Sequence, residues 1–159
     1  MEKITFDSLT KSKLSEFNKA ELQGWIIDQF QQLENRIDSK IIEYFQPNDK
    51  IKFEKIVLNS TIINNGGKLK ILTNIGVKKT TIEKLRTVAR IRNGFSHTRI
   101  RQNITIMISD NANNPEKNQI LSESIIDVMN SNGKITSKSA YEWIIEFLTL
   151  RNELRKELN

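Results

Sequence analysis

The chain has 159 residues, of which 37% are apolar and 28% charged, and its formal net charge at pH 7 is +6. These values are typical of one globular domain, so we expect residues 1–159 to form a single unit, with residues 1–12 as a loosely packed N-terminal segment. Because the sequence has no cysteine and one histidine, disulfides, thiol nucleophiles and cysteine-ligated zinc are excluded and a transition-metal site is disfavoured, although carboxylates could still hold magnesium.

The sequence shows no sign of a membrane or secretory segment. The first residues lack the apolar core of a signal peptide, and no apolar run approaches the roughly 20 residues that span a bilayer. We therefore expect a cytoplasmic protein that has no membrane partner and needs no cofactor.

A long amphipathic helix is the clearest predicted element. Its apolar residues recur at steps of three and four, which places them on one helix face. They are Leu22, Ile26, Phe30, Leu33, Ile37, Ile41 and Tyr44. The pattern predicts a helix that starts between Ser12 and Asn18 and ends at Phe45, before Pro47.

Shorter helices are predicted to follow. One covers residues 49–58, and a loop at 64–67 leads to two more at 68–75 and 80–95, which separate near Gly76. Alternating isoleucines at 104–108 predict a strand, a turn-rich loop follows at 111–115, and 125–129 can form a second strand.

The last predicted element is a helix that begins at Ser137 or Ser139 and ends at Leu158. Ser139 and Glu142 have the spacing of a capping box. Taken together, the pattern predicts a mainly α fold, a bundle of four or five helices with a small β-hairpin inserted before the C-terminal helix.

Residues 92–97, Arg-Asn-Gly-Phe-Ser-His, are the most informative part of the sequence. They contain the single histidine, and they lie in a segment, 78–101, with eight Lys or Arg against one acid. Histidine is the side chain that exchanges protons most readily near neutral pH. Its position in a cationic field indicates chemistry on, or recognition of, a phosphate-bearing partner.

The predicted helix constrains how these side chains can cooperate. Arg92 has apolar residues three, four and seven positions away, so it belongs to the apolar face and needs a carboxylate or a phosphate as counter-ion. Asn93 and His97 are four residues apart and share one side. Arg92 and His97 are five apart, about 140° around an ideal helix, so they converge only at the helix edge or where Gly94 loosens the last turn.

These six residues resemble the Arg-x4-6-His signature of HEPN domains, in the form Arg-Asn-x-Phe-small-His. The context is similar to the mannitol-repressor branch of that family, where the signature lies between a helix and a β-hairpin. The specific match covers six residues, and the topological resemblance covers about residues 20–155. Gly94 departs from the family pattern, which often has a charged residue at this position.

The resemblance implies a helical bundle that dimerises through the motif helix and, in many members, a metal-independent endoribonuclease that serves as a toxin or defence component. Arg92 would then bind the scissile phosphate of RNA, His97 would transfer the proton of the ribose 2′-hydroxyl or of the leaving oxygen, and Asn93 would orient the phosphate or the imidazole. A homodimer would supply the two histidines that paired acid–base catalysis requires. An antitoxin or another regulatory protein is a further expected partner.

Other members of the family are not enzymes, so a non-catalytic dimeric regulator or interaction module is the alternative. In that interpretation His97 caps carbonyls, Phe95 fills the core, and Arg92 pairs with an acid of the long helix. The acids considered are Glu21, Asp28 and Glu34.

Basic residues around the motif are the predicted nucleic-acid contacts, namely Lys78, Lys79, Arg90, Arg99 and Arg101. A solvated basic face is the alternative interpretation of the same charges. Direct reading of DNA is disfavoured, because no helix-turn-helix signature is present.

Overall fold

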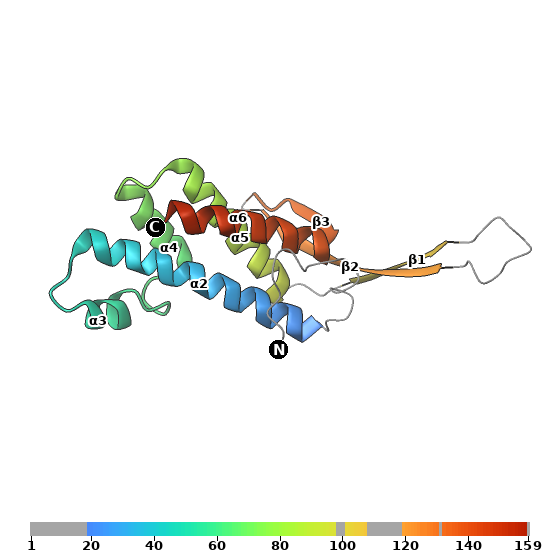
Figure 1. Cartoon of the computed structure of the whole chain (residues 1–159), viewed down its shortest axis with the longest axis horizontal. Coiled ribbons are helices and arrows are strands. Elements are labelled where there is room, and N and C mark those ends of the chain that lie inside the picture. The colour runs from blue at the N-terminus through green and yellow to red at the C-terminus, as the bar shows by residue number, and fades with distance from the viewer. Residues whose placement is uncertain (1–18, 98–100, 108–118, 131, 159) are drawn as a thin grey trace, which may run out of the picture.

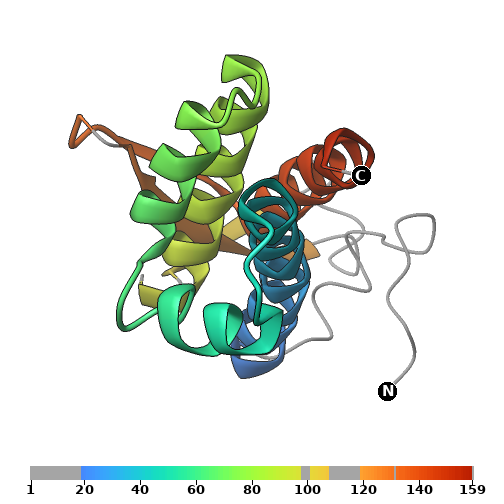
Figure 2. The same ribbon diagram turned by 90° about the vertical axis from the view of Figure 1, so that its left-hand side faces the viewer.

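The computed structural model describes residues 19–97, 101–107, 119–130 and 132–158. Helices α2, α5 and α6 lie side by side in a bundle, and the hairpin of β1 and β2 extends away from it (Figures 1 and 2). In chain order the elements are α2 (Lys19–Phe45), α3 (Lys50–Lys52), the π-helix η2 (Phe53–Val57), α4 (Asn65–Asn74), α5 (Lys79–His97), β1 (Arg101–Met107), β2 (Gln119–Met129), β3 (Ile135–Ser139) and α6 (Ala140–Glu157).

The predicted fold class is confirmed: the chain is mainly helical, with an antiparallel hairpin before the C-terminal helix. Within the described part of the chain, no helix combines the length and the hydropathy needed to cross a membrane. The predicted N-terminal segment at 1–12, the start of the first helix and the loop at 111–115 lie outside the described residues.

The apolar stripe of α2 builds one side of the core. Its residues from Leu22 to Ile41 are buried as predicted, whereas Tyr44 is 60% exposed, so the stripe ends one turn earlier than the sequence suggests. The opposing side chains come from α5 and α6 and include Leu85, Val88, Ile91, Phe95, Ile144, Phe147 and Leu154.

Two helix boundaries differ from the prediction for local reasons. The segment at 49–58 is helical, but after α3 it widens into a π-turn in which the Leu58 N–H donates to the Phe53 carbonyl at 3.1 Å. Residues 65–67, predicted as a loop, form the first turn of α4, because the Asn64 side chain accepts the Gly67 N–H at 2.9 Å and caps the helix. Gly76, with a φ of +92°, separates α4 from α5 as expected.

The sheet has one strand more than the predicted hairpin. Its three antiparallel strands follow the order β1-β2-β3, with Arg101 of β1 opposite Ile125 of β2, and Ile125 opposite Ser139 of β3. The sequence did not predict β3 because Ile135 is the only apolar residue in its five positions, so the strand shows no hydrophobic alternation.

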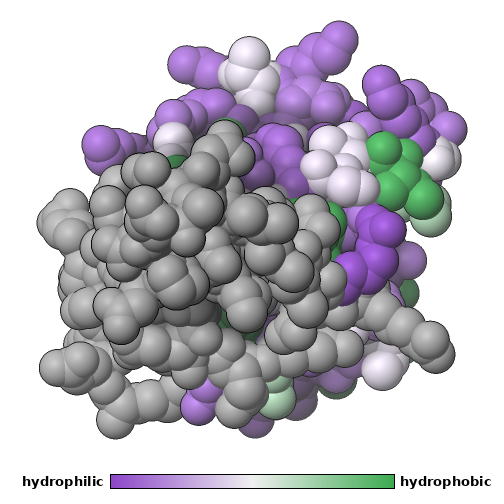
Figure 3. Space-filling view, turned by 90° about the vertical axis from the view of Figure 1, so that its right-hand side faces the viewer, coloured by the Kyte–Doolittle hydropathy of each residue, from purple (hydrophilic) through white to green (hydrophobic). Residues whose placement is uncertain are grey.

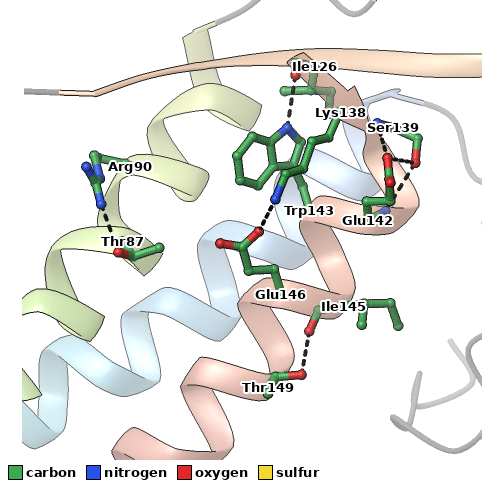
Figure 4. A network of polar contacts seen from close by, with 10 residues as sticks. All are labelled: Thr87, Arg90, Ile126, Lys138, Ser139, Glu142, Trp143, Ile145, Glu146 and Thr149. Atoms are coloured by element: carbon green, nitrogen blue, oxygen red, sulfur yellow. Dashed lines mark hydrogen bonds and ion pairs between the residues drawn. The ribbon is translucent and has the colours of Figure 1, made fainter. Parts of the chain in front are cut away.

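The corner between β3 and α6 attaches the last helix to the sheet (Figure 4). Ser139 ends β3 and caps α6 in a complete capping box with Glu142. The indole N–H of Trp143 donates to the Ile126 carbonyl of β2 at 2.9 Å, and the Lys138 ammonium lies 4.4 Å from the centroid of the same indole. Strand β2 and helix α6 are thereby held at a fixed separation.

A buried ion pair connects α4 to α2. Lys68 is 5% exposed, and its Nζ lies 2.6 Å from Oδ1 of Asp38. Burial raises the pKa of the Asp38 carboxyl, and the hydrogen bond from Lys68 opposes that rise. The pair therefore positions α4 against α2, and the Lys68 ammonium balances the charge of the Asp38 carboxylate.

We predict that Lys68→Met lowers the free energy of unfolding by about 3–5 kcal/mol at pH 7, because it leaves the Asp38 carboxylate buried and unpaired. The loss should shrink as the pH falls, since burial raises the folded-state pKa of Asp38 and a protonated carboxyl no longer needs its partner. Urea denaturation measures the change.

The exposed Lys70 on the same helix is the matched control, and Lys70→Met should change stability by less than about 0.5 kcal/mol. The double variant Asp38→Leu/Lys68→Met should recover most of the loss. Equal effects of the two single lysine substitutions would contradict the assignment.

Candidate functional site

The motif occupies the last two turns of α5. The helix continues without a break through Gly94 to His97, so Arg92 and His97 keep their separation of about 140° around the axis. Asn93 and His97 are both exposed, whereas Arg92 is partly buried. The three predicted catalytic residues therefore lie together at one end of the helix, with Arg92 on a different flank from the other two.

Arg92 lies against α2. Its Cζ is 4.8 Å from the centroid of the Phe30 ring, and its Nη1 donates to Oδ1 of Asn93 at 2.9 Å. No described carboxylate forms an ion pair with this guanidinium, so the predicted alternative of a pair with an acid of the long helix is not seen in this part of the chain. The guanidinium is oriented by an aromatic ring and an amide, and its charge is available to an anion.

The end of α5 is attached to α2 by Gln23, a residue that the sequence pattern does not single out. Gln23 donates its side-chain N–H to the Phe95 carbonyl, and the Ser96 hydroxyl donates to the Arg92 carbonyl at 2.9 Å. Phe95 itself is fully buried, as the sequence predicted for a core side chain. Gln23 follows a residue of the apolar stripe, and nothing else in the sequence distinguishes it from the other glutamines of α2.

Gly94 allows α5 to contact β2 without an intervening side chain. A Cβ atom built on Gly94 would lie 2.7 Å from Cγ2 of Val128 and 3.3 Å from the Asp127 carbonyl oxygen. The glycine that departs from the HEPN pattern thus avoids an overlap with the neighbouring strand. The same contact fixes the height and rotation of the motif relative to the sheet.

The basic segment around the motif is partly neutralised within the fold. Lys84 pairs with Glu153 at 2.7 Å and also with Glu157, and Arg86 pairs with Glu83 at 2.6 Å. These pairs withdraw part of the local positive charge that the sequence predicts.

The predicted phosphate contacts nearest to the motif also have partners within the chain. Arg101 contacts both oxygens of Asp127, at 2.7 and 2.8 Å, and hydrogen bonds from Ser137 and Arg101 lower the pKa of that carboxyl. Arg90 donates to Asn130 at 3.1 Å and to Thr87 at 2.8 Å, which directs it to the end of β2.

The remaining predicted contacts do not gather at the motif. Lys78 and Lys79 are exposed at the start of α5, about 27 Å from His97 at 1.5 Å per residue. A cavity of about 740 Å³ opens at that distant end, between α2, the α4–α5 turn and the end of α6. Arg99 lies outside the described residues. On the side of the molecule that carries the hairpin, the visible surface of the described residues is mostly hydrophilic (Figure 3).

Comparisons with known proteins identify no relative: no family model, curated protein or solved structure matches the chain. Among the residues that the structure describes, no three His, Asp or Glu side chains gather as a ligand set for a metal ion. The arrangement of the motif therefore carries the functional argument by itself.

We predict that Gly94→Ala lowers the free energy of unfolding by about 1–3 kcal/mol, because the new methyl group overlaps Val128. Gly24→Ala is the matched control, since a methyl group on that helical glycine would have no atom within 4 Å, and it should stabilise the protein by roughly 0.5–1 kcal/mol. Denaturant midpoints compare the two. In a Val128→Ala background the Gly94→Ala loss should be smaller, and an unchanged loss would refute the proposed clash.

We also predict that Arg92→Ala changes the free energy of unfolding by no more than about 1 kcal/mol, the worth of one partly exposed contact with an aromatic ring. The substitution leaves no described carboxylate without its partner, so the larger cost of breaking a buried ion pair should not arise. Thermal and urea denaturation check this. A loss of several kcal/mol would show that Arg92 is a structural residue.

Proposed function

We propose that this chain is a HEPN-like, metal-independent endoribonuclease that acts as a homodimer, in the manner of a toxin or defence component. The observation that carries the proposal is the partly buried Arg92 guanidinium, which is oriented by Phe30 and Asn93 and has no described carboxylate partner. A phosphate is the natural counter-ion for a guanidinium placed in this way.

The chemistry follows from the side chains at the end of α5. Arg92 binds the scissile phosphate and stabilises the charge that develops on its oxygens. The His97 imidazole takes the proton of the ribose 2′-hydroxyl, whose oxygen attacks phosphorus as the bond to the 5′-oxygen breaks. The products are a 2′,3′-cyclic phosphate and a 5′-hydroxyl.

The leaving 5′-oxygen needs a proton in the same step. One chain offers one imidazole, and the partner subunit's His97 supplies the second across a dimer cleft formed by the motif helices. The exposure of Asn93 and His97 on one side of α5 leaves both side chains accessible to such a partner. Dimerisation is then a chemical requirement of the reaction.

A non-catalytic dimeric regulator is the second candidate, including a transcriptional regulator similar to the mannitol-repressor branch. The favouring observation is that Lys84, Arg86 and Arg101 form ion pairs within the chain, which reduces the cationic surface available to RNA near the motif. In that case the motif holds the end of α5 and the partner is a protein.

We predict that the purified protein cuts labelled RNA in EDTA and that His97→Ala lowers the rate by about 10²–10⁴-fold, the usual contribution of a general acid or base. The products should carry a 2′,3′-cyclic phosphate, and DNA should stay intact because it lacks the 2′-hydroxyl. Gel analysis of end-labelled fragments measures rate and end group.

Lys70→Ala, at an exposed position of α4 outside the predicted RNA contacts, is the control and should not change the cleavage rate. Excess His97→Ala protein mixed with wild type should reduce activity more than dilution does, since mixed dimers have one imidazole. Wild-type protein that never cuts RNA, with or without added metal ions, points to the regulator. Cleavage that survives in His97→Ala removes this residue from the mechanism.

A further inference from the structure

A buried arginine on α6 has no counter-ion in the described part of the chain. Arg151 is 8% exposed, its Nη2 donates to Oε1 of Gln32 on α2 at 2.8 Å, and its Nε is buried without a hydrogen-bond partner. Helices α2 and α6 run alongside each other here (Figures 1 and 2). Because a guanidinium keeps its proton, the charge at this contact persists at every ordinary pH.

Neighbouring side chains add positive charge. Arg36 of α2 donates to the backbone carbonyl of Arg155 on α6 at 3.4 Å, and the charges of both arginines lie near enough to act on Arg151. Burial, followed by the charges of Arg155 and Arg36, lowers the pKa of Arg151, and only Asp28 opposes them. The Asp28 carboxylate is linked to Arg151 only through Gln32. It accepts a hydrogen bond from Gln32 at 3.4 Å, and Gln32 in turn accepts one from Arg151.

The spacing of these residues makes the arrangement a row. Asp28, Gln32 and Arg36 are four residues apart on α2, and Arg151 and Arg155 are four apart on α6, so each set follows one helix face. The two rows face each other where α2 and α6 pack together, through the bond from Arg151 to Gln32 and the bond from Arg36 to the Arg155 carbonyl. Polar groups therefore lie along this helix contact at successive turns, and the Nε of Arg151 is buried there without a hydrogen-bond partner.

We propose that Arg36, Arg151 and Arg155, the α2–α6 arginine cluster, form a binding site for a phosphate group. A buried unpaired cation is costly, and a doubly charged oxyanion that accepts several N–H groups removes that cost. Planar guanidinium groups match phosphate oxygens better than lysine ammonium groups do. The site lies on the α6 side of α2, whereas Arg92 contacts Phe30 on the α5 side, and it does not depend on ribonuclease activity.

The test is a titration with potassium phosphate, compared with potassium chloride at equal ionic strength. The side-chain Nε–Hε signal of Arg151 in a nitrogen–proton correlation spectrum should shift in a saturable way, and the melting temperature should rise as phosphate stabilises the folded state. Arg151→Met should weaken phosphate binding roughly tenfold or more, the effect of losing charge-assisted hydrogen bonds. Arg86, exposed and paired with Glu83, is the control, and Arg86→Met should bind phosphate as the wild type does.

Stability without phosphate provides a second readout. Arg151→Met should be at least as stable as the wild type in chloride buffer, because it replaces an unpaired buried charge with an apolar chain of similar length. A marked loss of stability would overturn the proposal, since Arg151 would then serve the fold. The exposed Arg155→Gln is a second, independent binding test and should weaken phosphate binding several-fold.

A single-stranded RNA oligonucleotide distinguishes the source of the phosphate. If RNA displaces inorganic phosphate from Arg151, the site holds a backbone phosphate; if RNA leaves the Arg151 signal unchanged, the site holds a free phosphate or a small phosphate ester. Either result supports the site. An Arg151 signal that responds to neither ligand, or phosphate affinity that is equal in wild type and Arg151→Met, overturns it.

Discussion

The contact between α5 and β2 at Gly94 fixes the position of the motif. Because a side chain at this point would overlap Val128, the missing side chain of Gly94 lets the helix and the strand pack closely together. The approach directs Phe95 into the core and Arg92 towards Phe30, and it leaves Asn93 and His97 on the solvent side. Gln23 then holds the Phe95 carbonyl near the end of α5 from the other direction. The geometry of the motif is therefore a consequence of how tightly the sheet packs on the bundle.

Much of the fold follows from local sequence patterns. The three- and four-residue steps of α2 are a direct record of its buried face, and the Ser139–Glu142 spacing locates the start of α6. Strand β3 could not be found in this way, because it is held by pairing with β2 and by the corner into α6 and not by apolar side chains of its own. A strand that is held by pairing with its neighbour, and not by its own apolar side chains, leaves no hydrophobic alternation in the sequence.

The position of the candidate site could be predicted from the sequence, but the residues that surround it could not. A short motif and one histidine were enough to locate Arg92, Asn93 and His97 at a helix end. The sequence could not indicate that acids distant in the chain, such as Glu153 and Asp127, neutralise Lys84 and Arg101. Residues 78–101 are therefore strongly basic as a sequence, but part of that charge is balanced in the folded protein by acids from other elements. The sequence likewise carries no sign that Arg151 is a buried charge, because its contact with Gln32 forms only when α2 and α6 pack together.

The corner between β3 and α6 has no connecting residue, because Ser139 is both the last residue of the strand and the cap of the helix. With the Trp143 indole bonded to β2, a bend at this corner would break a cap and a buried hydrogen bond together. The three-stranded end of the sheet and the C-terminal helix therefore open as one cooperative unit, which local fluctuations cannot divide. Because β2 is also a strand of the protruding hairpin, a displacement of that hairpin is transmitted to α6 through the hydrogen bond from Trp143 to Ile126.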